Sequence, residues 1–121
     1  MNKHGFQTEI EFELPKGYLD ESGELHKRGS MRMATAADEI LPLRDPRVQQ
    51  NEAYLAVIVL ARVVTRLGSV EDVSTSVIER LFASDLAYLQ RLYERFNSSE
   101  ATEPASMAAQ GPRRMMAVGE A

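Results

Sequence analysis

The sequence contains no cysteine, which excludes a disulfide framework and a thiolate metal site. This absence suits the reducing cytoplasm, where we expect the protein. Its two histidines, His4 and His26, lie far apart and neither has a partner at ligand spacing, so we expect both on the surface. There is no glycine-rich phosphate loop, and the carboxylates fall on a strand face or at helix starts, where structural roles explain them. We therefore expect no catalytic site and no cofactor.

Basic side chains are in deficit, with 14 Lys and Arg against 18 Asp and Glu. Such a balance does not attract phosphate backbones, so we expect no nucleic acid partner. Apolar runs are short as well. The longest is the nine residues from Ala53 to Ala61, whereas a membrane-spanning helix needs about 20. The N-terminus also lacks the apolar core of a signal peptide, and no membrane insertion is expected.

The composition of the 121 residues, 44% hydrophobic and 26% charged, is typical of one small domain. We place an α+β domain at residues 1–97. Small residues, Pro and Gly dominate residues 98–121, where no apolar period survives, and this predicts a flexible tail. Within it, the motif Arg113-Arg114-Met115-Met116 is a candidate adhesive segment. A tail without any binding role is the alternative.

The N-terminal segment shows the alternation of a half-buried strand. Apolar side chains from Phe6 to Leu14 alternate with polar ones, and the strand is expected to end near Leu14 because Pro15 cannot donate to a ladder. The turn cluster Asp20–Gly23 suggests a second, nested hairpin. The other strand face carries the carboxylates of Glu9, Glu11 and Glu13. We interpret it as a solvated face, and a site for a metal or a basic partner is the alternative. If Ser30–Thr35 pairs with this strand, Arg32 lies across from them.

Helix signals follow. Thr35 is placed to cap a short helix over Ala36–Leu41, with Asp38 and Glu39 in its first turn. Pro46 to Gly68 then reads as one long central helix, capped by an aspartate and ended by the glycine. Its middle is apolar all round and must be covered on every side. Either its own hairpin and neighbouring helix enclose it, or another copy or a partner covers part of it.

A second amphipathic helix is predicted over Val77–Asn97, and it most simply lies antiparallel to the central helix. The expected fold is an N-terminal β-hairpin layer packed on a two-helix antiparallel hairpin. Asp85 falls on the apolar stripe, where an unpaired carboxylate is costly. We predict a structural ion pair with Arg62 or Arg66. A position at the wet edge of the stripe and a partner-binding role are the alternatives.

Three stretches resemble the Mu-like tail assembly chaperone family of contractile-tailed phages, which also occurs in prophages and contractile injection systems. They are LPKGYLDESGELHKRGSMRMATAADE, LPLRDPRVQQNEAYLAVIVLARVVTRLG and VIERLFASDLAYLQRLYERFN, and the resemblance covers about Phe6 to Asn97. It implies a non-catalytic assembly factor. Such proteins coat the helical tape-measure protein in the host cytoplasm before the tail tube polymerises, and they give way to tube subunits. In several phages a translational frameshift adds a further domain.

Two binding functions follow as hypotheses: a chaperone whose partners are the tape-measure protein and tail tube subunits, with possible self-association, or a structural baseplate or tube-end component. An exposed apolar strip is the physical means of holding a long amphipathic helix. The side chains expected to form it, which are also core candidates, are Tyr54, Leu55, Ile58, Val59, Phe82 and Leu86.

Overall fold

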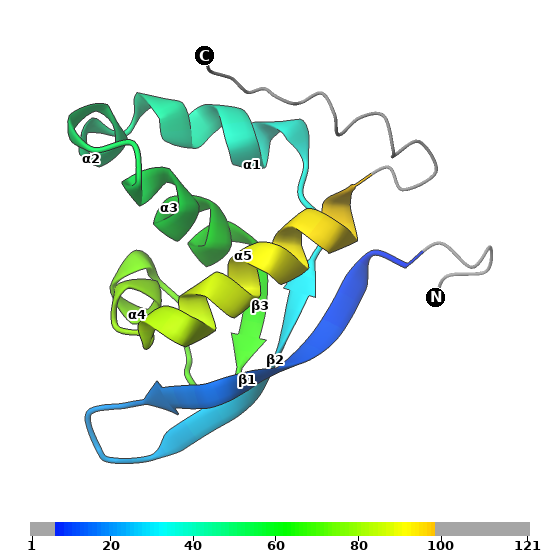
Figure 1. Ribbon diagram of the computed structural model, residues 1–121, viewed down its shortest axis with the longest axis vertical. Helices are drawn as coiled ribbons and strands as arrows, with labels where there is room; N and C mark the ends of the chain where they lie inside the picture. Colours follow the sequence, from blue (N-terminus) through cyan, green and yellow to red (C-terminus); the bar gives the residue numbers. More distant parts are fainter. Residues whose placement is uncertain (1–6, 99–121) are drawn as a thin grey trace.

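The computed structural model describes residues 7–98, and its first element is a long β-hairpin. Strand β1 (Glu9–Leu19) pairs antiparallel with β2 (Leu25–Arg32), and β2 pairs antiparallel with β3 (Val64–Leu67) in the order β1-β2-β3 (Figure 1). The alternation along the first half of β1 buries Phe12 and Leu14 and leaves the glutamates exposed. The predicted α+β class and N-terminal hairpin are confirmed.

The predicted end of the first strand is wrong, because β1 continues through Pro15 to Leu19. The pairing register shifts between Glu13 and Tyr18, so the proline falls in an irregular segment that does not need its missing N–H. Gly17 takes a positive φ of 102° there. The turn predicted at Asp20–Gly23 is confirmed, with Leu19 paired to Leu25, but it closes the main hairpin instead of a separate nested one.

The predicted pairing of the segment around Met31 with the first strand is confirmed, and Arg32 lies opposite Glu9. The helices are short: α1 (Ala36–Ile40), the 3₁₀ helix η1 (Leu41–Arg44), α2 (Pro46–Gln50), α3 (Tyr54–Val63), α4 (Thr75–Glu79) and α5 (Ala83–Asn97). Thr35 is the N-cap of α1, and Asp45 caps α2 by accepting from the Arg47 N–H. These two caps agree with the sequence.

The predicted central helix from Pro46 to Gly68 is wrong in two places. Asn51 has an extended backbone and its side chain accepts from the Ala53 N–H, which separates α2 from α3. The chain then leaves the helix at Val64, where β-branched residues favour the strand that pairs with β2. Gly68, with φ 55°, follows a strand instead of ending a helix.

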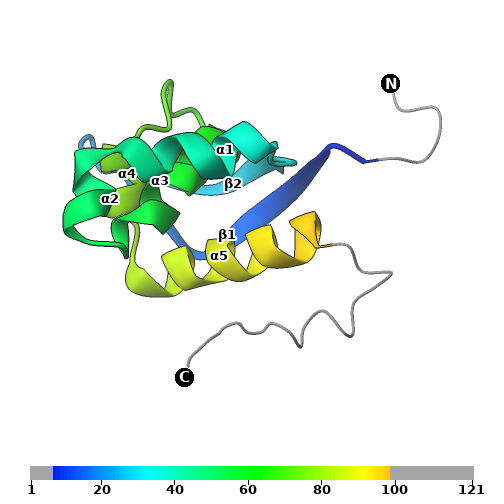
Figure 2. The ribbon, with the colours of Figure 1, turned by 90° about the horizontal axis from the view of Figure 1, so that it is seen from above.

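The predicted helix over Val77–Asn97 is also divided, because Phe82 has an extended backbone and becomes the N-cap of α5. Strand β3 thus replaces the end of the predicted central helix, and α4 forms near the start of the predicted second helix. In Figure 1, α5 runs across the strands, and α1, α2 and α3 gather beyond one end of the sheet. Figure 2 shows α5 along one side of the molecule, next to β1.

The core lies between the inner face of the sheet and helices α3, α4 and α5. Its least exposed apolar side chains are Leu14, Met31, Leu60, Val63, Leu67, Ile78 and Leu89. Residues Val57–Leu60 of α3 are buried by the chain itself, whereas Tyr54 to Ala56 are only half-buried. No helix in residues 7–98 has both the length and the apolar character to cross a bilayer. The predicted tail, apart from Ser98, and His4 lie outside the described residues.

Candidate binding groove

An apolar groove of about 590 Å³ lies where η1, α3 and α5 meet. Leu43 comes from η1, and one side of α3 contributes the rest of the apolar lining, which includes Leu55, Ala56 and Val59. The spacing of three and four residues along α3 places these side chains on one face of the helix. Helix α5 closes the other side with Gln90, Tyr93 and Glu94.

The rim of the groove is acidic. Glu39, Glu52 and Glu94 line it, and none of the lining residues is basic. Glu39 accepts a hydrogen bond from the Tyr93 hydroxyl. Burial, followed by this contact with Glu39, raises the pKa of Tyr93, so its hydroxyl remains a donor across the neutral range. Glu52 and Glu94 make no side-chain hydrogen bond or ion pair within residues 7–98, which leaves two carboxylates free to meet a cationic partner.

Large exposed apolar side chains lie in the chain next to Leu43, which lines the groove. Ile40, Leu41 and Leu43 are 58%, 44% and 51% exposed, and they follow one another around Pro42. A cluster of this kind on a small protein is typical of an interaction site. We call Leu43, Leu55, Val59 and the exposed pair Ile40 and Leu41 the groove patch.

The structure separates the six side chains predicted to bind a partner. Leu55 and Val59 line the groove, although Val59 is only 7% exposed. Ile58 is buried, Leu86 packs against the core, and Phe82 is half exposed but away from the groove. Tyr54 hydrogen-bonds to Glu79, and Arg47 lies over its ring.

Sequence reasoning missed Ile40, Leu41 and Leu43. It interpreted the stretch around Pro42 as the end of a helix and an elbow, and it assigned no role to its side chains. The available signal was that three large apolar residues stand in so short a connection. No strand or helix of sufficient length surrounds them to bury them all.

The predicted ion pair of Asp85 with Arg62 or Arg66 is wrong. Asp85 is fully buried, and its two carboxylate oxygens accept hydrogen bonds from the backbone N–H groups of Lys16 and Gly17 at 2.9 and 2.8 Å. These donors are free because β1 is irregular there. Asp85 is also the third residue of α5, where the helix dipole favours an anion.

The two arginines have other surroundings. Arg62 donates from Nε to Asp38 at 2.9 Å, and Arg32 forms a bidentate pair with the same carboxylate at 2.7 and 3.0 Å. Arg66 lines a polar hollow together with Glu9 and other residues of the sheet. The hydrogen bond from Arg32 is the main cause that holds the pKa of Asp38 well below its usual range. This network joins β2, α1 and α3.

His26 was predicted on the surface but is only 4% exposed. Its Nδ1 accepts from the Ser69 N–H at 3.3 Å, and its Nε2 lies 2.8 Å from the Asp20 carboxylate. Since a backbone amide can only donate, the ring proton of the neutral imidazole is on Nε2 and is donated to Asp20. Asp20 also accepts from the Ser22 and Glu24 N–H groups, and the hydrogen bond to His26 is the largest cause that lowers its pKa.

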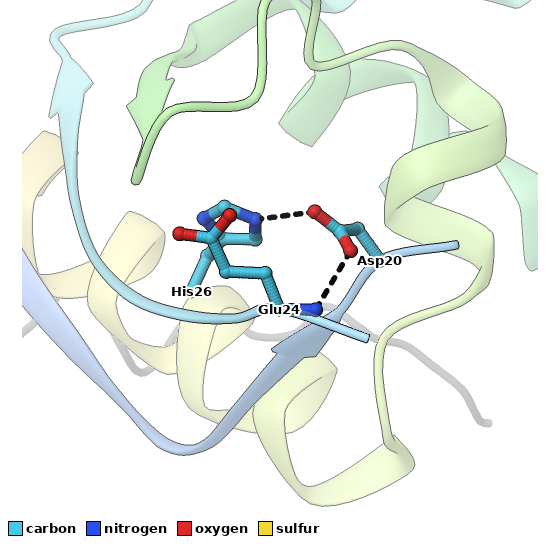
Figure 3. Close-up of side chains that lie close together, drawn as sticks. All are labelled: Asp20, Glu24 and His26. Carbon is cyan, nitrogen blue, oxygen red and sulfur yellow. Dashed lines mark hydrogen bonds and ion pairs between the residues drawn. The ribbon is translucent and has the colours of Figure 1, made fainter. Parts of the chain in front are cut away.

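Asp20, Glu24 and His26 each offer one ligand atom within 4.8 Å of the others (Figure 3). A metal ion would need His26 Nε2 as a lone-pair donor. The hydrogen bond from Ser69 holds the ring in the opposite tautomer, and the Asp20 carboxylate already closes the turn. We therefore assign the cluster the structural role of fixing the hairpin turn against the end of β3.

Comparison of the chain with models of known protein families, with curated proteins and with solved structures found no match.

Proposed function

We propose that the protein is a non-catalytic tail assembly chaperone of the Mu-like kind, which binds a helical segment of the tape-measure protein in the host cytoplasm. The observation that carries this proposal is the apolar groove with an acidic rim. A helix with an apolar stripe places side chains at i, i+3 and i+4 into such a groove. The resemblance of residues 6–97 to tail assembly chaperones supplies the identity of the partner.

Charge and burial define the helix that fits. Apolar side chains of the partner cover Leu43, Leu55 and Val59, while lysine or arginine residues beside its stripe face Glu52 and Glu94. Rim carboxylates of this kind contribute to the association rate and to the choice of partner more than to affinity. We therefore expect a helix with basic flanks, and we expect its binding to weaken as salt increases.

The small size of the groove suits a chaperone that must release its partner. A groove of about 590 Å³ offers one helix face a short contact. Affinity for a long tape measure then comes from many copies bound along it, and tube subunits displace them one at a time. Tail tube subunits are the second partner in this proposal.

The test is co-expression of the full chain with the tape-measure protein encoded near it, followed by co-purification and light scattering. We expect a soluble complex with many copies per tape measure. Leu43→Glu is expected to abolish the complex, because it places a carboxylate in the apolar part of the groove. Leu19→Glu is the matched control, since Leu19 is 53% exposed on the hairpin and Leu43 is 51% exposed.

Two results would contradict the proposal. If the tape measure precipitates while this chain stays in solution, the chaperone function fails. If Leu43→Glu and Leu19→Glu retain the complex equally well, the tape measure binds outside the groove.

A further inference from the structure

The last helix of the part of the chain that the structure describes, α5, ends beside the groove. Gln90, Tyr93 and Glu94 of α5 line it, and α5 ends at Asn97, less than one turn after Glu94. Asn97 is held in place: its Oδ1 accepts from the Ala34 N–H at 2.8 Å and its Nδ2 donates to the Tyr93 carbonyl at 2.9 Å. The following segment therefore starts from a fixed point close to the acidic rim.

The sequence after Asn97 contains one short stretch that matches the groove in both charge and apolar character. Arg113 and Arg114 are its sole basic residues, and Met115 and Met116 follow them directly. Methionine adapts its shape to irregular apolar surfaces, and arginine pairs with carboxylates in a bidentate way. The groove offers an apolar floor and the free carboxylates of Glu52 and Glu94.

The length of the connection allows this stretch to return. Arg113 follows Asn97 by 16 residues, which extend to roughly 53–58 Å at most. A random-coil chain of 16 residues has a root-mean-square span of about 20–24 Å. Such a tether keeps its end at an effective concentration of the order of 1 mM around the groove.

We propose that residues 113–116 occupy the groove of their own chain when no partner is bound. The methionines cover Leu43, Leu55 and Val59, and the arginines face Glu52 and Glu94. This inference rests on the groove of the proposed function, whose access it regulates. Since a partner helix must displace the segment, the apparent affinity for the partner falls by the fraction of grooves that are closed. Reversing the two arginine charges is expected to strengthen partner binding about 2- to 10-fold.

The absence of cysteine allows a direct test on the full chain. A nitroxide label on Gln90→Cys lies at the groove, and the methionine methyl groups are observed by NMR. We expect the Met115 and Met116 signals to broaden, and the broadening to disappear in Arg113→Glu/Arg114→Glu. The same label on Glu71→Cys, at an exposed position that does not line the groove, is the control and is expected to leave both signals unchanged.

A mixture of labelled chains with unlabelled, isotope-enriched chains identifies the owner of the segment. Broadening only when the nitroxide and the isotopes are on the same chain supports the proposal. Equal broadening in the mixture, where they are on different chains, shows docking on a second copy and overturns it. Sharp Met115 and Met116 signals with the Gln90→Cys label also overturn it, while the Leu43→Glu result still decides the chaperone function. Broadened signals together with a precipitating tape measure would leave this inference standing and remove the proposed function.

Discussion

At the scale of single residues, Asp85 shows how a carboxylate is buried without a cation. It accepts two backbone hydrogen bonds from the irregular segment of β1, and the first turn of α5 adds a favourable dipole. The side chain thereby fastens the helix to the hairpin. Without it, the buried N–H group of Gly17 and the partly buried N–H group of Lys16 lose their acceptor.

Asp85→Asn is expected to lower the free energy of unfolding by about 2–3 kcal/mol, the range for buried hydrogen bonds to a charged group. The amide keeps one acceptor but turns a donor toward the second N–H. Urea denaturation followed by circular dichroism measures the change.

Asp72→Asn, at an exposed position, is the control and is expected to stay within about 0.5 kcal/mol of the unmodified protein. Equal losses in the two variants would show that the bonds to Lys16 and Gly17 do not stabilise the fold.

At the scale of elements, Arg32 and Arg62 hold α1 against the sheet and α3 with different numbers of bonds. Arg32 donates twice to Asp38, and also to the carbonyls of Met33 and Arg62. Arg62 donates once, to Asp38. Both guanidinium groups are more than a third exposed, which moderates the strength of their ion pairs.

We expect Arg32→Gln to cost about 1–2 kcal/mol of unfolding free energy and Arg62→Gln less than about 1 kcal/mol. Hydrogen exchange of the α1 amides provides the measurement, because this helix depends on Asp38 for its position. Exchange is expected to accelerate more in Arg32→Gln. The opposite order would place the main anchor of α1 on α3 instead of β2.

The sequence predicted those elements whose signals depend only on residues close to them in the chain. Thr35 and Asp45 cap the helices that begin directly after them. The alternation of buried and exposed side chains from Phe12 to Leu14 arises within a single strand. The prediction failed at Val63 and Val64, which follow the apolar run from Ala53 to Ala61. A run of apolar residues does not distinguish a helical period from a strand period. Pairing with β2 decides that the last part is a strand.

The candidate site was predicted in part for the same reason. The apolar run pointed to Leu55 and Val59, which line the groove. Leu43 becomes a lining residue only when η1 packs against α3, and the burial of His26 depends on Ser69, 43 residues later. Such meetings of distant segments leave no period or local motif in the sequence.

At the scale of the whole molecule, carboxylates bound to arginines contribute to the response to acid, as does Asp20 bound to His26. The hydrogen bond from Arg32 depresses the pKa of Asp38, and that from Arg47 lowers the pKa of Asp45 to about 2. An unfolded aspartate titrates near about 3.9. The unfolded chain therefore binds protons first as the pH falls, so these groups stabilise the fold fully above about pH 4 and lose that effect as the pH falls through their folded values.

We expect the free energy of unfolding to decline between about pH 4 and pH 2, and the decline to be shallower in Asp38→Asn, which starts from a lower value at pH 7. Urea titrations at a series of pH values provide both slopes. Asp72→Asn is again the control, with an unchanged slope. If the free energy of unfolding declines with the same slope at low pH in the unmodified protein and in both variants, Asp38 is ruled out as a source of the pH dependence.

The bond between Asp85 and β1 also affects the order of events during synthesis. Lys16 and Gly17 leave the ribosome 69 and 68 residues before the carboxylate that will accept from them. At 5–20 residues per second, the hairpin waits roughly 3–14 s with these two amides bonded to water. During that time α5, which packs against β1, does not yet cover the hairpin. The hairpin is therefore completed only after α5 has been made, and until then part of it is exposed to other proteins in the cell.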